Sequence, residues 1–360
     1  METQDPTPPA GRARGQHPTI ATIASEMGLS RATVTHVLNG RGAQQRISPE
    51  TQQRVLEVAL RLGYRPNASA RAIRAGRFGS IGLVQALRGL YLPPLLLDGL
   101  SRAVTDLRMH LVMTQVPDDV IDDEAYFPHA LSDLSVDGVL VNRHTGCSQA
   151  FIRRLHELHI PAVFINVGQE YDCVHPDEVG GGRMATAFLQ NLGHERIAYV
   201  DKDEPGETHF SVRDRHAGYV LQMEDAGCMP WRHSLPSHWE ITGRLDADAR
   251  VESARELLAR PDRPTAVVAY ELTEAITVTR AASLLSLRIP QDLSIVQFHD
   301  WIDDHSFIPI HTVCNVMHLV GAEAVRMIVE KIDRPETALP ARIVPMHLIP
   351  GASCMPPGPN

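Results

Sequence analysis

Several protein classes depend on features that this 360-residue chain lacks. Its five cysteines are scattered, with no C-x-x-C pair, so a disulfide framework and a zinc knuckle are both disfavoured. No apolar run reaches the roughly 20 residues of a membrane-spanning helix, and the first residues lack the apolar core of a secretory signal. There is neither a phosphate-binding P-loop nor a G-x-S-x-G nucleophile elbow. We therefore expect a cytoplasmic protein with no catalytic residues, metal ion, cofactor or membrane partner.

Positive charge is scarce in the chain as a whole but not at its N-terminal end. The net charge of the full sequence is −9. Residues 1–77 contain 11 arginines, no lysine and five acidic residues, a net charge of +6, whereas the remainder has 23 basic and 38 acidic residues, a net charge of −15. A basic segment joined to an acidic body is suited to contacting a polyanion such as DNA through one end only.

Two short helices joined by a tight turn are predicted by the segment IATIASEMGLSRATVTHVLN, residues 20–39. In the first helix, apolar residues recur at helical spacing, and Gly28 then supplies the positive φ that a turn needs. Ser30 can cap the second helix, whose inner face carries Val34 and Val37. Helices of this length and connection form a helix-turn-helix, which places its second helix in the DNA major groove.

A third helix and a basic segment follow in order. Ser48 is the expected N-cap of the third helix, and Pro49 is its first residue. We expect an apolar stripe on this helix, made of Val55, Leu56, Ala59 and Leu62. A short arginine-rich helix is expected from Asn67 to Ala75, and it leads through two glycines into a β-strand.

These segments together resemble the LacI/GalR family of bacterial transcription regulators. The matching text is TIATIASEMGLSRATVTHVLNG, then ISPETQQRVLEVALRLGYRPNASARAIRAG, then SIGLV, and weaker similarity continues to about residue 350. The resemblance implies an N-terminal helix-turn-helix headpiece (19–66), a hinge helix and linker (67–78), and a two-lobed, periplasmic-binding-protein-like core that binds an effector and dimerises (79–349). We expect residues 1–18 and 350–360 to be disordered tails.

From Ser80 onward, short apolar strands alternate with helical patterns, which predicts an α/β fold with parallel sheets covered on both faces. These elements are too many for one small sheet. We therefore expect two Rossmann-like lobes, about 80–166 and about 196–300, with the chain crossing back near 310–330. The expected strands are 80–84, 110–115, 136–142, 161–166, 196–201, 265–270 and 293–298.

The resemblance implies which residues meet DNA. In the second helix, Arg31 suits a bidentate contact with guanine, and Ala32 suits an apolar contact with a thymine methyl group. His36 departs from the arginine common in the family, and either a base or a phosphate is its expected partner. Ile73 stands where the family places a leucine that wedges into the minor groove; packing between domains is the alternative. The full predicted DNA-binding set is Thr19, Ser30, Arg31, Ala32, Thr33, Thr35, His36, Asn39, Asn67, Ala70, Arg71, Ile73 and Arg74.

Ligands of open α/β lobes bind beyond the carboxyl ends of the strands, which selects polar residues there and the segment 202–215. Arg215 stands at the spacing of the family's effector-binding arginine. We expect it to open a helix, where the helix dipole disfavours a cation, and therefore to meet a ligand anion or hydroxyl cluster. A salt bridge to Asp214 or another neighbour is the alternative. The predicted effector-binding residues are Tyr91, Asn142, Asn166, Arg215, Tyr270, Glu271, His299, Trp301 and Asn315.

The sequence thus predicts a homodimeric transcriptional repressor that binds a near-palindromic, double-stranded operator and senses a small molecule, with a carbohydrate expected. An acidic sugar is a further hypothesis, because the expected cleft contains the cations Arg143, His144, Arg215 and His299. Dimerisation is expected from a leucine-rich face at 92–100, made of Leu92, Leu95, Leu96 and Leu100. Two alternatives stay open: a solute-binding or sugar-processing protein with the same core, and a regulator that has lost its effector response.

Overall fold

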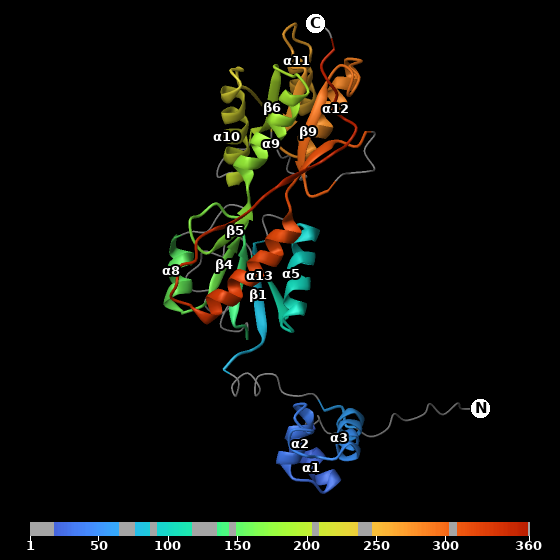
Figure 1. Ribbon diagram of the computed structural model, residues 1–360, viewed down its shortest axis with the longest axis vertical. Coiled ribbons are helices and arrows are strands. Elements are labelled where there is room, and N and C mark those ends of the chain that lie inside the picture. Colours follow the sequence, from blue (N-terminus) through green and yellow to red (C-terminus); the bar gives the residue numbers. More distant parts are fainter. Residues whose placement is uncertain are drawn as a thin grey trace, which may run out of the picture. The chain divides into compact units, whose positions relative to one another are not determined.

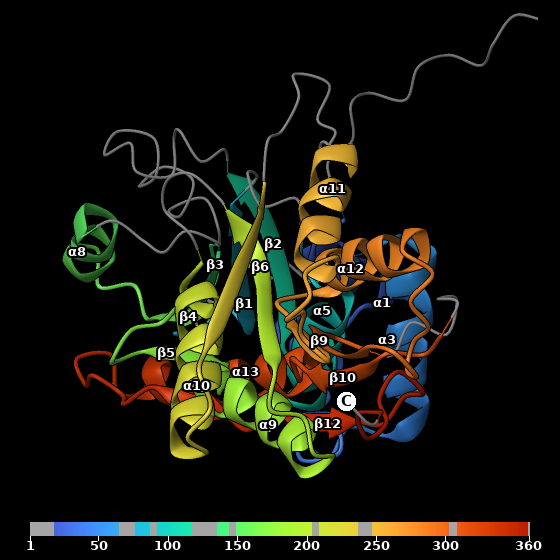
Figure 2. The same cartoon turned by 90° about the horizontal axis from the view of Figure 1, so that it is seen from above.

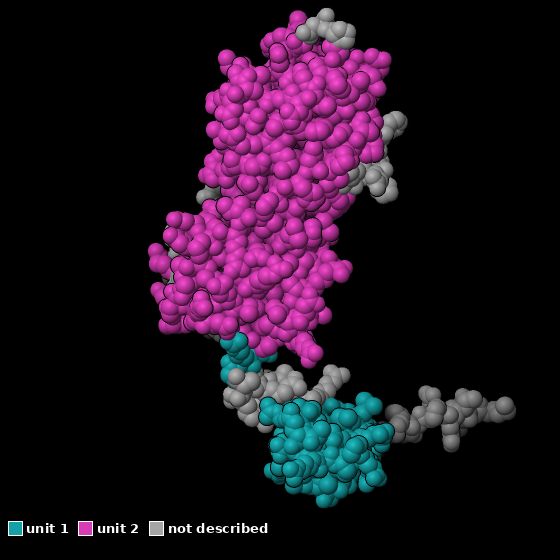
Figure 3. Space-filling model, viewed as in Figure 1, with its two compact units in different colours: residues 1–78 teal, residues 79–360 magenta. Residues whose placement is uncertain are grey.

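The computed structural model forms two compact units, residues 1–78 and 79–360, which Figure 3 colours separately. The structure describes residues 18–64, 76–86, 92–116, 135–143, 149–203, 209–236, 247–301 and 308–358. Outside these ranges lie Tyr91, His144 and the part of the predicted hinge that holds Asn67, Ala70, Arg71, Ile73 and Arg74. Within the described ranges, no helix is long and apolar enough to cross a membrane.

The first unit contains three helices, α1 (Ile20–Met27), α2 (Arg31–Leu38) and α3 (Pro49–Arg61), drawn in blue in Figure 1. Each starts at a hydroxyl cap, because Thr19, Ser30 and Ser48 accept hydrogen bonds from the backbone N–H three residues further on. Gly28 ends α1 with a φ of 64°. The predicted turn and the predicted caps Ser30 and Ser48 are therefore confirmed. The core of this unit is Ile23, Ala24, Val34, Val37, Val55 and Ala59.

One residue of the expected stripe on α3 does not join this core. Val55 is fully buried and Ala59 is nearly so, but Leu56 is 53% exposed. Adjacent residues on an α-helix are about 100° apart, so a helix that packs through Val55 and Ala59 turns Leu56 toward solvent. The prediction for Leu56 is wrong. Leu62 contacts the core as a partly buried side chain.

The second unit contains two six-stranded sheets, which define its lobes 1 and 2 (Figures 1 and 2). Neighbouring strands are parallel except β12, which is antiparallel to β10. This confirms the predicted two-lobed α/β fold. In spatial order, lobe 1 has β11 (Arg342–Val344), β5 (Cys173–Pro176), β4 (Ala162–Ile165), β3 (Gly138–Asn142), β1 (Ser80–Ala86) and β2 (His110–Val116). Lobe 2 has β12 (His347–Ile349), β10 (His311–Cys314), β9 (Ser294–His299), β8 (Ala266–Ala269), β6 (Ile197–Asp203) and β7 (Trp231–Pro236).

Helices cover both faces of each sheet. Along β1, Ile81 and Leu83 pack with α5 and α13, whereas Val84 packs with α8 on the opposite face, as the two-residue period of a strand requires. In lobe 2, α9 and α10 pack on one face, and α11 and α12 pack on the other. These helices are α5 (Pro94–Asp106), α8 (Gln149–Glu157), α9 (Glu178–Asn191), α10 (Phe210–Asp225), α11 (Ala247–Leu258), α12 (Leu272–Leu284) and α13 (Met317–Asp333).

The chain passes between the lobes three times (Figure 1). It leaves lobe 1 after β5, returns after β10 through α13, and crosses again between β11 and β12. The predicted return near 310–330 is confirmed. The sequence pattern missed β5, β7, β10, β11 and β12, which have only three to six residues each. Apolar runs are a weak signal for strands this short.

The expected disordered tail at 350–360 is wrong for residues 350–358, which the structure describes. Ser353 is fully buried; its hydroxyl donates to Ile295 O (2.6 Å) and accepts from His311 N (2.9 Å). Nε2 of His194 lies 2.9 Å from Met355 O. The proline- and glycine-rich composition favoured disorder, but partners that are distant in sequence supply the hydrogen bonds.

The leucine-rich face at 92–100 belongs to the interior of lobe 1. Leu96 and Leu100 are fully buried, and Leu92 and Leu95 pack against the same cluster, which includes residues of α13. These leucines are therefore used within one chain, and the predicted reason for dimerisation is wrong.

Candidate functional site

The face of α2 that points away from the core carries the predicted base-contacting residues. Arg31, Ala32 and Asn39 are exposed, and His36 is partly exposed. Within the described ranges, no hydrogen bond or ion pair engages the side chains of Arg31, His36 or Asn39. This face therefore presents a guanidinium, an imidazole and an amide that are available to another molecule.

The hydroxyl residues of the predicted DNA-binding set have bonds inside the unit. Ser30 Oγ accepts from Thr33 N (3.0 Å), and the Thr35 hydroxyl donates to Arg31 O (2.7 Å). Thr19 and Thr22 form a capping box at the start of α1. These residues shape the helix-turn-helix, whatever contacts they make with DNA.

The second unit has a polar cleft at the carboxyl ends of the central strands of both sheets. Six of the nine predicted effector-binding residues line it: Asn142, Asn166, Arg215, Tyr270, Glu271 and Asn315. His299 and Trp301 are not among its lining residues; their rings lie 4.7 Å apart and Trp301 is exposed. Arg143 and Asp300, which also follow strand ends, line the cleft as well, and so do His209 and Ser211 of the selected segment 202–215. The sequence pattern did not select the other lining residues, which are Gln85, Pro93, Pro176, Glu178 and Met317.

Arg215 is a buried member of an ion pair. The helix that contains it, α10, begins at Phe210, so the expectation that Arg215 opens a helix is wrong. Its Nε and Nη2 donate to the two carboxylate oxygens of Glu178, at 2.5 and 3.3 Å. Its remaining bonds go to Tyr270 O (2.8 Å) and Asn315 Oδ1 (3.0 Å). The alternative of a salt bridge is therefore what the structure contains, with Glu178 as the partner.

The charge of Arg215 is balanced inside the protein. Burial lowers the pKa of Arg215, but Glu178, Tyr270 and Tyr199 together raise it further, so the pKa ends above its ordinary value. The Arg215 guanidinium also lies 4.4 Å from the centre of the Phe298 ring. Arg215 is therefore a charged hydrogen-bond donor with a fixed orientation, and Glu178 is its counter-ion.

A close helix crossing brings this pair together. A Cβ atom at Gly182 of α9 would overlap the carbonyl oxygen of Arg215, and one at Gly218 of α10 would overlap that of Val179. Glu178 lies one turn before Gly182, and Arg215 lies one turn before Gly218. The glycine run of α9 thus has a packing role, which explains its presence without a phosphate ligand.

Hydrogen bonds connect the cleft residues across the two lobes. The His209 ring bonds to Asn166 O (Nε2, 2.9 Å) and to the Ser211 hydroxyl (Nδ1, 2.7 Å), and Ser211 Oγ bonds to the Tyr270 hydroxyl (2.8 Å). Burial raises the pKa of Tyr270 to about 12, so its hydroxyl stays protonated at neutral pH. This chain of groups ties the start of α10 in lobe 2 to the end of β4 in lobe 1.

The side chain of Asn166 in the cleft has an unmet hydrogen bond. Asn166 Oδ1 is buried and accepts no hydrogen bond in the described part of the protein. The nearby amide of Asn142 donates to Gln85 Oε1 (2.7 Å), and that of Asn315 donates to Asp300 Oδ1 (3.1 Å). A buried acceptor without a donor is rare, so Asn166 Oδ1 is a natural contact point for a ligand.

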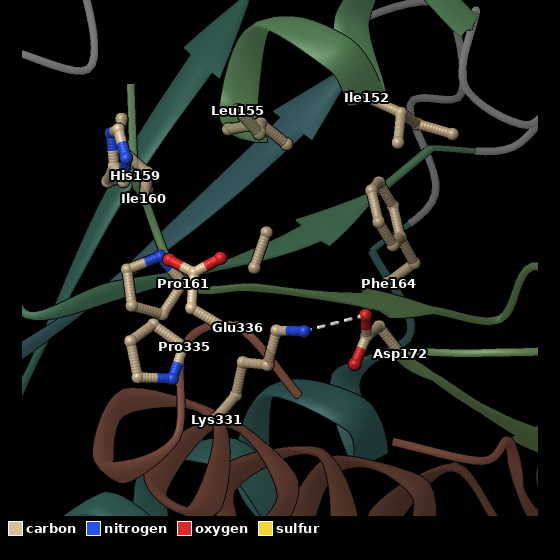
Figure 4. A pocket seen from close by; sticks show the side chains of 11 residues that line it. Ile152, Leu155, His159, Ile160, Pro161, Phe164, Asp172, Lys331, Pro335 and Glu336 are labelled. Atoms are coloured by element: carbon tan, nitrogen blue, oxygen red, sulfur yellow. Dashed lines mark hydrogen bonds and ion pairs between the residues drawn. The ribbon is translucent and has the colours of Figure 1, made fainter. Parts of the chain in front are cut away.

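A second, small cavity lies in lobe 1 between α8, β4 and the end of α13 (Figure 4). Its one buried cation, Lys331, points toward Asp172 and donates to that carboxylate (2.8 Å) and to Thr337 O (2.7 Å). The other carboxylate oxygen of Asp172 accepts from Leu339 N (3.0 Å). These contacts brace the chain after α13, which gives the pair a structural role.

A helix-turn-helix with an unengaged outer face, joined in sequence to a two-lobed core with a polar cleft, defines a DNA-binding protein that also carries a small-molecule site. Residues 19–67 match the family of bacterial regulatory proteins named lacI, and residues 186–354 match the periplasmic binding protein-like domain.

Curated relatives agree over nearly the full length. The transcriptional regulator CelR of Thermobifida fusca is 29% identical over 343 residues, which cover 92% of this chain and 96% of CelR. The transcriptional repressor PurR of Vibrio vulnificus (strain CMCP6) is 26% identical over 341 residues, which cover 91% and 96%. The chain belongs to the LacI family and is a DNA-binding transcriptional regulator.

Solved structures have the same fold. The lac repressor dimer bound to operator and the anti-inducer ONPF superposes with a TM-score of 0.76, covering 94% of this chain and 100% of that one. At 20% identity this likeness concerns the fold alone. The complex of the regulator CelR with cellobiose has a TM-score of 0.60 at 26% identity, with coverage of 93% and 99%.

Proposed function

We propose that this regulator is a cytoplasmic repressor whose affinity for operator DNA is controlled by a neutral carbohydrate bound in the cleft between lobes 1 and 2. The observation that carries this proposal is the lining of the cleft, in which amides, hydroxyls and carboxylates surround a charge-balanced guanidinium. A ligand rich in hydroxyl groups needs both donors and acceptors of this kind. The relative CelR was solved with cellobiose, which adds support for a carbohydrate.

A neutral ligand is favoured over the acidic sugar that the sequence also suggested. That hypothesis relied on four cations: Arg143, His144, Arg215 and His299. Arg143 and Arg215 line the cleft, whereas His299 does not. Glu178 already occupies the carboxylate-binding edge of Arg215. Glu271 and Asp300 add further negative charge to the cleft lining. A ligand carboxylate would therefore compete with Glu178 and meet repulsion from the other two acids.

The unpaired acceptor of Asn166 argues against a regulator without an effector. Asn166 Oδ1 has no donor in the described part of the protein, and a ligand hydroxyl could supply one. Control of DNA binding requires that the effector prefer one arrangement of the lobes and the operator another. In a mobility-shift assay with a duplex selected from random DNA, the effector should therefore change operator affinity. If the chain were instead a solute-binding or sugar-processing protein, no duplex would be selected from the random DNA.

Replacing Asn166 by alanine is expected to weaken sugar binding about tenfold, because a ligand hydroxyl would lose its acceptor. The effector is first found in a thermal-shift screen of neutral sugars, uronates and sugar phosphates, and its affinity is then measured by calorimetry. Asn191→Ala, at an exposed position near the end of α9, is the matched control. Stabilisation by acidic sugars alone, or parental affinity in the Asn166 variant, would contradict the proposal.

The proposed homodimer has a different basis from the one that the sequence suggested. Exposed apolar side chains lie at the end of α5 and on the edge strand β2 (Leu107, Val112 and Met113), and on α12 (Ile276 and Leu284). Apolar side chains gathered on a surface are typical of protein–protein contacts. The lac repressor of the same fold was solved as a dimer on its operator.

The double change Met113→Glu and Ile276→Glu is expected to convert the dimer into a monomer at micromolar concentration, because each glutamate would be desolvated in the interface. Sedimentation velocity measures the change. Met229→Glu is the control, since Met229 is 85% exposed and lies on neither surface. A monomeric parent, or a double variant that remains dimeric, is the result that counts against this assignment.

A further inference from the structure

The first residue of α10, Phe210, contacts lobe 1 although its helix packs in lobe 2. Val212 and Tyr219 fix the helix to the core of lobe 2. The Phe210 ring, however, meets the ring of His175 in β5 edge to face, with 5.2 Å between the ring centres. It also lies directly against Gly168, in the loop that follows β4. Phe210 therefore bridges the two lobes.

Gly168 allows the ring to approach this closely. Its φ lies outside the left-handed region, so the turn itself does not require glycine. A Cβ atom on Gly168 would lie 2.8 Å from Cδ2 of the Phe210 ring, which is closer than the two carbon atoms can pack. The ring is thus seated on bare backbone, and this contact needs one particular placement of the lobes.

The loop that receives the ring is anchored within lobe 1. Asn166 N donates to Val174 O (2.8 Å), and the Cys173 thiol donates to Gln169 O (2.9 Å). Val167 packs in the core of lobe 1. Because the loop is held by lobe 1 and the ring by lobe 2, their contact depends on the relative position of the lobes.

Phe210 is not among the residues that line the polar cleft, but its two neighbours in sequence are. His209 and Ser211 both line the cleft, and Nε2 of His209 lies 2.9 Å from Asn166 O. Any movement that separates Phe210 from Gly168 also draws His209 away from Asn166, because Phe210 and His209 are adjacent. The ring contact and the shape of the cleft therefore change together.

We propose that Phe210 is a positioning residue that latches lobe 2 onto Gly168 and His175 of lobe 1, and that the latched and unlatched arrangements differ in affinity for operator DNA. This inference rests on the proposed control of DNA binding by the cleft. A ligand that contacts Asn166 of lobe 1 and Ser211 of lobe 2 at once favours the latched arrangement, because that arrangement brings both groups to one cleft. Phe210 thus links occupancy of the cleft to the arrangement of the lobes.

A disulfide in place of the ring contact tests this latch directly. In the double variant Gly168→Cys and Phe210→Cys, the two Cβ atoms would start 3.1 Å apart, slightly closer than the range of about 3.5–4.5 Å found in disulfides. The oxidised form is held in the latched arrangement, whereas the reduced form has lost the ring. Their dissociation constants for a duplex that the parent protein selects from random DNA should differ by about fivefold or more.

Single substitutions separate the latch from a general loss of packing. Phe210→Ala should resemble the reduced form in operator affinity, and Phe210→Leu, which keeps an apolar contact, should lie closer to the parent. Leu221→Ala is the matched control, because Leu221 lies on the same helix and is 41% exposed. The two single cysteine variants, treated with the same oxidant, control for the native cysteines. Peptide mass spectrometry and non-reducing electrophoresis verify that the disulfide forms within one chain.

The outcomes distinguish the latch from the proposed function. If the parent selects no duplex, the DNA-binding function is contradicted and the latch assignment falls with it. The comparison of oxidised and reduced forms uses no sugar, so an error in the proposed carbohydrate does not alter its result. If the disulfide does not form, the two residues are not adjacent and the latch is overturned. Equal affinity of the two forms for the selected duplex overturns it as well.

Discussion

Replacing Glu178 by alanine is expected to destabilise the two-lobed unit by about 3–5 kcal/mol, because the change leaves a buried arginine without its counter-ion. Arg215 and Glu178 have side chains only 7% and 2% exposed. Little solvent reaches the Arg215 guanidinium, and the three hydrogen bonds of Glu178 and Asn315 to Nε and Nη2 would be reduced to one. Urea denaturation at pH 7, followed by circular dichroism, measures the loss.

An exposed ion pair between the same two helices supplies the control. Arg183 of α9 and Asp225 of α10 form a salt bridge of 2.8 Å, with side chains 40% and 60% exposed. Pairs of this kind contribute about 0–1 kcal/mol, so Asp225→Ala should have little effect. If Glu178→Ala costs no more than Asp225→Ala, the buried pair does not hold α9 against α10 as inferred here.

The conservative change Glu178→Gln tests the link between this pair and ligand choice. Glutamine keeps an acceptor for Arg215 Nε but removes the negative charge. The Arg215 guanidinium would then carry an unbalanced charge at the cleft, and acidic sugars should gain affinity relative to neutral ones.

The helix-turn-helix could be predicted nearly residue by residue, because its signals are local. Hydroxyl caps at Ser30 and Ser48 and the turn glycine Gly28 each act on the backbone within four residues. Leu56 was misjudged for the complementary reason. A periodic stripe tells which helix face is apolar, but only the packing of α3 on α1 and α2 decides where the buried face ends.

The cleft could be predicted only in outline. The strand-end rule brought six predicted residues to one cavity, since parallel strands end at the same edge of a sheet. It could not show that Glu178 neutralises Arg215, because the pair depends on a crossing of α9 and α10 that brings together residues 37 positions apart. Nor could it show that the segment after residue 350 is ordered by Ser353, whose partners are Ile295 and His311.

Binding of the full protein to duplex DNA is expected to weaken about 1,000-fold or more between 50 and 200 mM salt, if each dimer neutralises about six to ten phosphates. Arginines of the first 77 residues supply the positive charge, which is +6 overall, while the rest of the chain carries −15. The acidic core is repelled by DNA, so attraction has to come from the helix-turn-helix and the segments beside it. In the described part of that unit, no acidic side chain pairs with Arg31, Arg41 or Arg46. Their positive charge is therefore fully available to attract DNA.

This dependence is measured by a mobility-shift or anisotropy titration at several salt concentrations, with sugar binding to the cleft followed in parallel. Sugar affinity should change little over the same range, because a neutral ligand releases no counterions and the Arg215–Glu178 pair is shielded from solvent. Raising the salt concentration should thus weaken DNA binding while sugar binding by the same chain is retained. A flat response of DNA binding, with the protein still folded and binding its sugar, would contradict the assignment of the basic N-terminal unit to DNA.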